Sequence, residues 1–145
     1  MENKDEFYMR QALHQASLAF DSDEVPIGAV VVSSGRVIGR GHNLVETLQD
    51  PTAHAEMQAI TAAASSIGGK YLTDCTLYVT VEPCAMCAGA LAWSQISRVV
   101  YGAEDIKRGY RHYCADMLHP KTKIEGGVLS QECEDLMQSF FVKLR

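Results

Sequence analysis

A cysteine pair at the start of a predicted helix is the first feature of the sequence that suits metal chemistry. In "VEPCAMCAGA", Pro83 lacks the amide hydrogen that would be unsatisfied at a helix start, and Cys84 and Cys87 then fall on one helix face. A lone C-x-x-C is also typical of a redox pair or of two small buried residues. His54 adds an imidazole from a second helix start, and two thiolates with an imidazole favour zinc over metals that prefer oxygen. We therefore predict a zinc site made by His54, Cys84 and Cys87.

These three residues leave a tetrahedral zinc ion with one open position. A structural zinc site is normally closed by a fourth protein ligand, whereas a catalytic site leaves that position to water. Cys75 is the nearest spare thiol, but it opens the strand that ends near Cys84, about twenty ångströms away at roughly 3.3 Å per residue. For the other thiols and imidazoles we expect buried or surface roles: Cys114, Cys133, His112 and His119. The predicted site is therefore open and catalytic.

A glutamate lies two residues after the histidine, in "DPTAHAEMQAI". Two positions apart on a regular helix point to nearly opposite sides, but at a helix start His54 can face the metal while Glu56 reaches a water beside it. Zinc lowers the pKa of such a water to about 7, and a neighbouring carboxylate can take up and return its proton. We therefore predict that Glu56 transfers protons, with a glutamate placed only to favour the helix dipole as the alternative.

The elements predicted around these residues alternate between strand and helix. Helices are predicted over 6–20, 54–66, 84–94 and 130–144, and strands over 26–32, 36–42, 75–81, 97–103 and 123–128. The unbroken Val30-Val31-Val32 indicates a strand covered on both faces. This order predicts an α/β fold, a three-layer sandwich with an antiparallel hairpin at one side and right-handed parallel crossovers after it. In such a sheet His54 and Cys84 meet at the carboxyl ends of the strands.

Length and composition are those of a globular protein. The 145 residues fit one domain over 1–145, and 47% hydrophobic with 21% charged residues is ordinary for a soluble chain. No apolar run approaches the roughly 20 residues of a membrane span, and the start "MENKDEFYMR" lacks the features of a secretory signal. We therefore expect a cytoplasmic protein without a membrane partner, whose five cysteines are thiols and not disulfides.

The charges are unevenly distributed along the chain. The net charge is −5, but between Arg98 and Lys123 six basic and three acidic residues leave +3. A basic patch on an acidic protein suits contact with a polyanion, and a solvated loop without a partner explains the charge equally well.

At this point the sequence resembles a known family. "HAE" followed by "PCAMC" resembles the H-x-E…P-C-x-x-C signature of the zinc-dependent cytidine deaminase superfamily. "DEVPIGAVVV", "LYVTVEPCAMCAGAL", "RVVYGAED" and the terminal "FFVKLR" are similar to the bacterial tRNA adenosine deaminases within it. The resemblance implies a cytidine deaminase-like α/β/α sandwich with a five-stranded mixed sheet, one zinc ion per subunit, and a homodimer whose interface helps build each active site. It also implies conversion of the wobble adenosine of a tRNA anticodon stem-loop to inosine, with release of ammonia and no organic cofactor.

The resemblance also implies a role for each matching residue. His54, Cys84 and Cys87 match the zinc ligands, Glu56 the proton shuttle, Asn43 the asparagine that hydrogen-bonds the base, and Asp105 and Lys107 the rim of the substrate groove. From the sequence alone, Asn43 is also typical of a turn after the second strand.

One segment departs from the family pattern. Many members carry small residues after the fourth strand, whereas this chain has "KRGYRHYCADMLHP". Tyrosine and arginine suit base stacking and phosphate contact, so we expect Tyr110 and Tyr113 to stack on bases and Arg111, with Lys107 and Arg108, to meet phosphates.

Two other functions are compatible with the zinc signature. A deaminase of free bases or nucleosides, such as guanine or cytosine, shares the signature and the fold. Such an enzyme should lack the basic loop and the aromatic-basic terminus seen here as Phe140, Phe141, Lys143 and Arg145. A non-catalytic module stapled by zinc is the second alternative, and Glu56 together with the missing fourth ligand argues against it.

Overall fold

Five strands form one mixed sheet in the computed structural model, which describes residues 3–144. The strands, in the spatial order β2-β1-β3-β4-β5, are β1 (Gly28–Ser33), β2 (Arg36–His42), β3 (Thr76–Val81), β4 (Arg98–Ala103) and β5 (Lys123–Glu125). β1 is antiparallel to both of its neighbours, and β3, β4 and β5 are parallel to one another. The predicted hairpin at one edge and the parallel crossovers are therefore confirmed.

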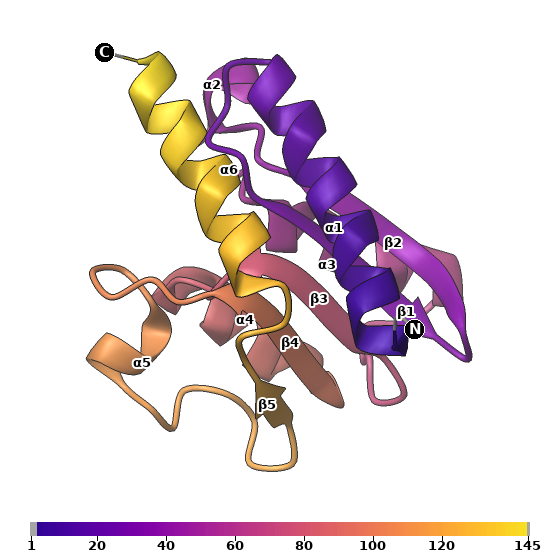
Figure 1. Ribbon diagram of the computed structural model, residues 1–145. Coiled ribbons are helices and arrows are strands. Elements are labelled where there is room, and N and C mark those ends of the chain that lie inside the picture. The colour runs from indigo at the N-terminus through magenta and orange to yellow at the C-terminus, as the bar shows by residue number, and fades with distance from the viewer. Residues whose placement is uncertain (1–2, 145) are drawn as a thin grey trace.

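Helices cover both faces of this sheet. They are α1 (Lys4–Asp21), α2 (Val45–Leu48), α3 (Ala55–Ile67), α4 (Ala85–Ser94), α5 (Tyr110–Tyr113) and α6 (Ser130–Lys143). α1 and α6 lie side by side on one face, and α3 and α4 lie on the other (Figure 1). The three-layer α/β/α architecture is confirmed. Among the described helices, none has the length and apolar character needed to cross a membrane.

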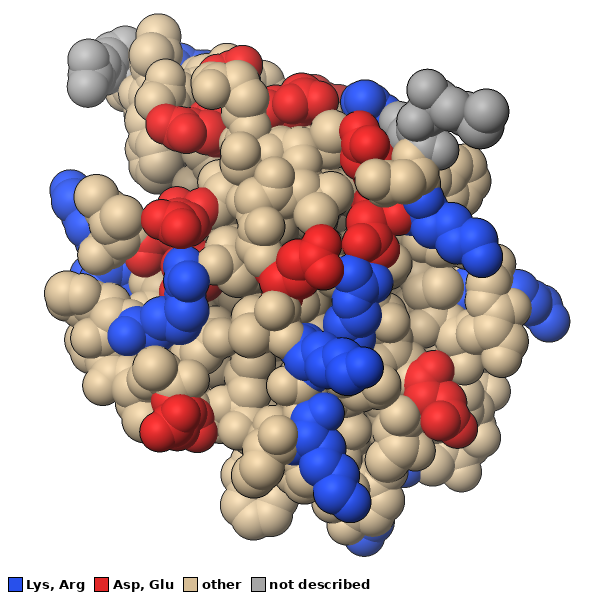
Figure 2. All heavy atoms as spheres, turned by 60° about the horizontal axis from the view of Figure 1, so that its bottom comes forward, with Lys and Arg blue, Asp and Glu red and all other residues tan. Residues whose placement is uncertain are grey.

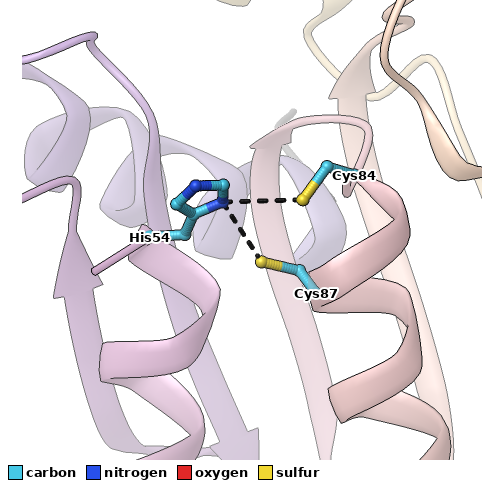
Figure 3. A group of neighbouring side chains, drawn as sticks. All are labelled: His54, Cys84 and Cys87. Atoms are coloured by element: carbon cyan, nitrogen blue, oxygen red, sulfur yellow. Dashed lines mark hydrogen bonds between the residues drawn. The ribbon is translucent and has the colours of Figure 1, made fainter. Parts of the chain in front are cut away.

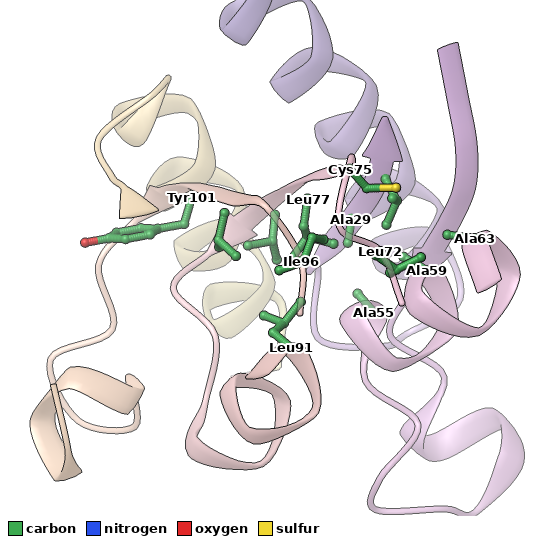
Figure 4. Close-up of a cluster of buried hydrophobic side chains, with 13 residues drawn as sticks. Ala29, Ala55, Ala59, Ala63, Leu72, Cys75, Leu77, Leu91, Ile96 and Tyr101 are labelled. Carbon is green, nitrogen blue, oxygen red and sulfur yellow. The ribbon is translucent and has the colours of Figure 1, made fainter. Parts of the chain in front are cut away.

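The central strands are buried from both sides, as the run of valines predicted. Ala29 and Val31 of β1 point to the cluster under α3 and α4, which Figure 4 shows, whereas Val30 and Val32 point to the cluster under α1. Side chains alternate across a strand, so one strand contributes to both layers of the core. Because side chains pack on both faces of the central strands, the carboxyl ends of β3 and β4 keep a fixed position relative to the helices.

The packing of α3 on β2 is unusually close. Ala55, Ala59 and Ala63 line the buried face of α3, and they lie against Gly39 and Gly41 of β2. A Cβ placed on Gly41 would lie 2.3 Å from the backbone oxygen of Ala55, the first residue of α3. Small residues on α3 and on β2 therefore determine how close the first turn of α3, which follows His54, lies to the sheet.

Two short helices were not predicted, and one strand is shorter than expected. α2 and α5 each have four residues, which is too short for a hydrophobic period to show. The last strand was predicted over 123–128, and it ends at Glu125 because Gly127, with φ +89°, turns the chain away from the sheet. The strand predicted over 36–42 matches β2, and the other predicted elements differ from the structure by at most two residues at either end.

We expect Gly41→Ala to lower the free energy of unfolding by about 1–3 kcal/mol, because the added methyl group displaces the first turn of α3. Urea denaturation measures the loss. Gly69→Ala is the matched control: nothing lies within 4 Å of its Cβ, and its stability should stay within about 0.5 kcal/mol of the parent. Equal stabilities for the two variants would contradict the close packing of α3 on β2.

Candidate metal centre and active site

Three metal-ligating side chains converge where α3 and α4 begin. The Nδ1 atom of His54 lies 3.5 Å from Sγ of Cys84 and 3.4 Å from Sγ of Cys87 (Figure 3). The three ligand atoms lie within 4.8 Å of one another, and together they form a group that could hold a metal ion. The residues singled out from the sequence are therefore brought together in space.

The spacing of these atoms suits tetrahedral zinc. With Zn–N near 2.05 Å and Zn–S near 2.3 Å, tetrahedral angles separate nitrogen from sulfur by about 3.6 Å. The observed distances of 3.4 and 3.5 Å are close to that value. The hydrogen bond with the Cys87 thiol lowers the pKa of Cys84 to about 4 and raises that of Cys87, so one thiol ionises readily.

Both helix starts carry a ligand at the N-cap position. His54 caps α3 and Cys84 caps α4, each with extended backbone angles and no capping hydrogen bond from its side chain. Cys87 lies one turn inside α4. The positive ends of both helix dipoles therefore point towards the thiolates, which stabilises their negative charge.

The loop before His54 is held by its own hydrogen bonds. The Asp50 carboxylate accepts from the backbone N–H and the hydroxyl of Thr52, at 2.8 and 2.7 Å. The backbone N–H of Leu44 donates to the carbonyl of Ala53 at 2.9 Å, which ties this loop to the segment after β2. The position of the imidazole is therefore set on both sides before any metal is bound.

Glu56 lies in the first turn of α3, beside the metal ligands and not among them. Its side chain is hydrogen-bonded to the Cys87 thiol, and the residue is only 4% exposed. Burial raises the pKa of the Glu56 carboxyl to about 7. A carboxyl group in this position can exchange protons with a molecule held next to the ligands.

A pocket opens beside His54 and Glu56. It has a volume of about 260 Å³, near the lower end of the range for ligand pockets, and its wall includes Asn43. The Oδ1 atom of Asn43 accepts from the backbone N–H of Val45 at 3.3 Å, so this residue both makes the predicted turn and lines the pocket.

Sequence reasoning missed a buried carboxylate in the same wall. Glu24, from "DEVPIGAVVV", is fully buried, and it accepts hydrogen bonds from the backbone N–H groups of Glu46 and Thr47 and from the Thr47 hydroxyl. Burial raises the pKa of Glu24, but these bonds outweigh burial and the net shift is downward. Glu24 thereby caps α2 and fixes one side of the pocket. An acidic residue four positions before a buried strand was the only signal in the sequence.

The family of the chain follows from its match over almost the whole sequence. Residues 2–145 match the family described as MafB19-like deaminase. The chain belongs to this deaminase family. The deaminase is 44% identical to the tRNA-specific adenosine deaminase of Bacillus subtilis, over 98% of its own length and 91% of the relative's.

Solved structures agree with this assignment. One comes from work on A-to-I editing by tRNA:A34 deaminases at the wobble position of transfer RNA. It is 40% identical to the deaminase with a TM-score of 0.83, and the match covers 90% of this chain and 98% of that one. The guanine deaminase of Bacillus subtilis is 37% identical with a TM-score of 0.68, over 81% and 72% of the two chains. The fold is therefore shared by deaminases with different substrates.

The basic stretch of the deaminase does not form one patch. Arg98 and Lys123 are paired in register at the start of β4 and β5, whereas Lys107, Arg108 and Arg111 follow the opposite end of β4. Figure 2 shows the face with α5 and β5, where acidic side chains lie beside several of the Lys and Arg side chains. The division follows from β4 itself, because the strand separates Arg98 at its start from the basic residues that follow its end.

One expectation for the loop after β4 is wrong, and a second residue of the loop has an intramolecular partner. Tyr110 is 1% exposed and therefore cannot stack on a splayed base. Arg111 is 41% exposed and forms ion pairs within the protein: its guanidinium donates to the Glu82 carboxylate, lies 3.5 Å from Glu104 and sits 5.1 Å from the centre of the Tyr101 ring. Residues elsewhere in the chain therefore bury the Tyr110 ring and pair the Arg111 charge.

The exposed residues of the loop include other members that we expected to contact RNA. Lys107 and Arg108 are exposed, and Tyr113 is 60% exposed with its ring against His112. The Oδ1 atom of Asp105 accepts from the backbone N–H groups of Lys107 and Arg108, at 3.1 and 2.9 Å. Asp105 therefore shapes the turn that presents the two basic residues.

The residues of the C-terminal helix α6 separate a tRNA deaminase from a free-base deaminase less clearly than the sequence suggested. Phe140 is 3% exposed and packs against Phe20, and Lys143 forms an ion pair with Asp23 at 2.8 Å. Phe141 is 47% exposed. Arg145 lies outside the described residues.

We expect Cys87→Ser and His54→Ala to abolish metal retention, because each removes one of three protein bonds to the ion. Metal content per chain after purification, measured by mass spectrometry, checks this. Cys114→Ser, at an exposed cysteine outside the group, should keep the metal content of the parent. Full metal content in either ligand variant would mean that another residue is a ligand.

Proposed function

We propose that this deaminase binds one zinc ion per subunit and converts adenosine to inosine at the wobble position (34) of tRNA, releasing ammonia. The observation that carries the proposal is the convergence of His54, Cys84 and Cys87 beside the buried Glu56 and a pocket. The tRNA-specific adenosine deaminase relatives, similar over nearly the whole chain, support the substrate.

Zinc fits the donor set better than metals that prefer oxygen ligands, since two thiols and one imidazole face one point. His54, Cys84 and Cys87 would hold the ion, and its chemistry there is to lower the pKa of water. Three protein ligands leave the fourth position open, as expected of a catalytic site.

Residues of the chain would orient the base and transfer the protons. Asn43, in the pocket wall, would hydrogen-bond the base and orient it. Glu56 would take one proton from the attacking water and deliver it to the ring nitrogen, and would then take the remaining proton of that water and pass it to the departing amine. A C–O bond forms at C6, the C–N bond breaks, and ammonia leaves. Burial of Glu56 keeps bulk water from competing for these protons.

The exposed residues of the loop after β4 suit an RNA partner. Lys107 and Arg108 can neutralise phosphates of the anticodon stem-loop, and Tyr113 presents an exposed ring on which a base can stack. We place Asp105 and Lys107 at the rim of the substrate groove, as the family resemblance implies. A tRNA substrate also favours a cytoplasmic location.

Helix α4 supports the homodimer that the resemblance implies. The helix "AMCAGALAWS" carries no charged residue, and Trp93 on its outer side is 85% exposed. Met86, one residue before Cys87, is 38% exposed. A helix that is apolar on its outer side suits burial against a second copy, and contact there would lie next to the metal ligands.

We expect Glu56→Gln to reduce inosine formation by about 10²- to 10⁴-fold while the metal content is unchanged, since the carboxylate handles protons and does not bind the ion. Inosine in an anticodon stem-loop and ammonia from free guanine, cytosine and adenosine are measured side by side. Turnover of free guanine alone would favour the activity of the guanine deaminase relative, and retention of activity in Glu56→Gln would remove this residue from the mechanism.

We expect RNA affinity to fall with salt, with a log–log slope of about −0.7 for each phosphate neutralised. Replacing Lys107 and Arg108 together by alanine should flatten that slope by roughly 1.4. Fluorescence titration of a labelled anticodon stem-loop between low and physiological salt measures it. A double variant with the slope and intercept of the parent would show that these residues do not hold RNA.

A further inference from the structure

Glu82 is a buried carboxylate that the chemistry described above does not use. It lies between the end of β3 and Pro83, two residues before the metal ligand Cys84, and its side chain is 3% exposed. An oxygen of its carboxylate lies 3.1 Å from the Arg111 guanidinium. The group is therefore a buried anion held by its partners.

The hydrogen-bond donors to the Glu82 carboxylate come from the segment after β4, here called the 104–113 loop. The Glu82 carboxylate accepts from the backbone N–H of Asp105 at 3.2 Å and from that of Arg111 at 3.3 Å. The Arg111 guanidinium adds two further bonds, from Nε at 3.2 Å and from Nη2 at 3.1 Å. One carboxylate thus binds both ends of the loop, and Arg111 binds it as a planar fork.

The loop also lies directly on the turn that carries Cys84. Gly109 pairs with Cys84 in an antiparallel bridge, and the backbone N–H of Tyr110 donates to the carbonyl of Pro83 at 2.9 Å. A Cβ on Gly109 would lie 2.4 Å from the Glu82 carboxylate, so only glycine permits this approach. Arg111 and Glu82 therefore fasten the loop to the metal-ligand turn.

Lys107 and Arg108 lie in the part of the loop between Asp105 and Arg111, the two residues that bind Glu82. Their backbone N–H groups donate to Asp105, whose own N–H donates to Glu82. The Gly109 N–H returns to the carbonyl of Asp105 at 2.8 Å. The direction in which the two basic side chains leave the protein therefore depends on the ion pair.

We propose that Glu82 and Arg111 are positioning residues, whose ion pair holds the 104–113 loop against the Cys84 turn so that Lys107 and Arg108 meet the RNA already ordered. This inference rests on the proposed function. Preordering lowers the free energy lost when a loop is immobilised on binding, so the ion pair acts on substrate affinity without touching the substrate.

The competing role for Arg111 is direct contact with a phosphate, and three variants separate the two roles. Arg111→Ala removes both charge and fork. Arg111→Lys keeps the charge but cannot make the planar, forked contact. Glu82→Gln releases Arg111 from its anion, which would leave RNA binding equal or tighter if Arg111 met phosphate, and weaker if the ion pair positions the loop.

Arg98→Ala is the matched control. Arg98 makes a forked ion pair with Asp5, at 2.9 and 2.7 Å, at the other end of β4. Breaking it removes an ion pair of the same kind without touching the loop, so the KM for the anticodon stem-loop should be unchanged.

We expect all three loop variants to raise that KM roughly tenfold, with kcat within about threefold and the zinc content unchanged. Plots of log affinity against log salt concentration should be parallel to that of the wild type and displaced to weaker binding, because Lys107 and Arg108 still neutralise phosphates once RNA is bound. The double variant Glu82→Gln/Arg111→Ala should be no weaker than the weaker single variant, since both act through one contact. Wild-type KM in Arg111→Lys or Glu82→Gln, or a flatter salt slope in Arg111→Ala, would overturn the inference.

Amide hydrogen exchange tests the loop without reference to RNA. The amides of Asp105 and Arg111 should exchange faster in all three variants and at the wild-type rate in Arg98→Ala, because the Glu82 carboxylate is their acceptor. Unchanged exchange would refute the positioning role even if the enzyme deaminates tRNA. If the amides exchange faster in the variants but the protein deaminates no RNA, the proposed function is refuted. The conclusion that the ion pair holds the loop would still stand.

Discussion

A metal site made by two helices requires their first turns to meet to within a few tenths of an ångström. His54 belongs to α3 and the two cysteines to α4, and the chain between these helices runs through β3. The sheet therefore acts as the common reference for both. Small residues bring α3 close to the sheet at Gly39 and Gly41. Rigid packing on both faces of the central strands supports the ligand geometry better than any contact within the site could do alone.

The sequence was most informative where local pattern and tertiary structure agree. Hydrophobic periodicity located the five strands and the four long helices, and strand–helix order was sufficient for the mixed sheet. His54, Cys84 and Cys87 could be grouped in advance because both stretches begin helices that follow buried segments at the same edge of the sheet. Their roles as zinc ligands, and that of Glu56 in proton transfer, stay predictions that rest on this geometry.

The loop after β4 shows why other features could not be predicted. Residue type alone made Tyr110 and Arg111 typical of RNA contact, yet one is buried and the other is paired with Glu82. The residue that pairs with a charge or covers a ring can lie far away in the chain, and the periodicity of the sequence does not identify it. Four-residue helices such as α2 are likewise set by a few hydrogen bonds from outside the helix, here from backbone N–H groups to Glu24.

The N-cap positions of α3 and α4 limit how this protein can be made more stable. Serine, threonine, aspartate and asparagine are the residues that cap helices well, and placing one there commonly adds about 1 kcal/mol. At positions 54 and 84 the chain instead has an imidazole and a thiol, neither of which makes a capping hydrogen bond. A search for stabilising substitutions that scores only the folded chain would therefore select these two sites. Evolution or engineering towards higher stability must therefore leave two helix ends imperfect, since improving them would remove the ligands.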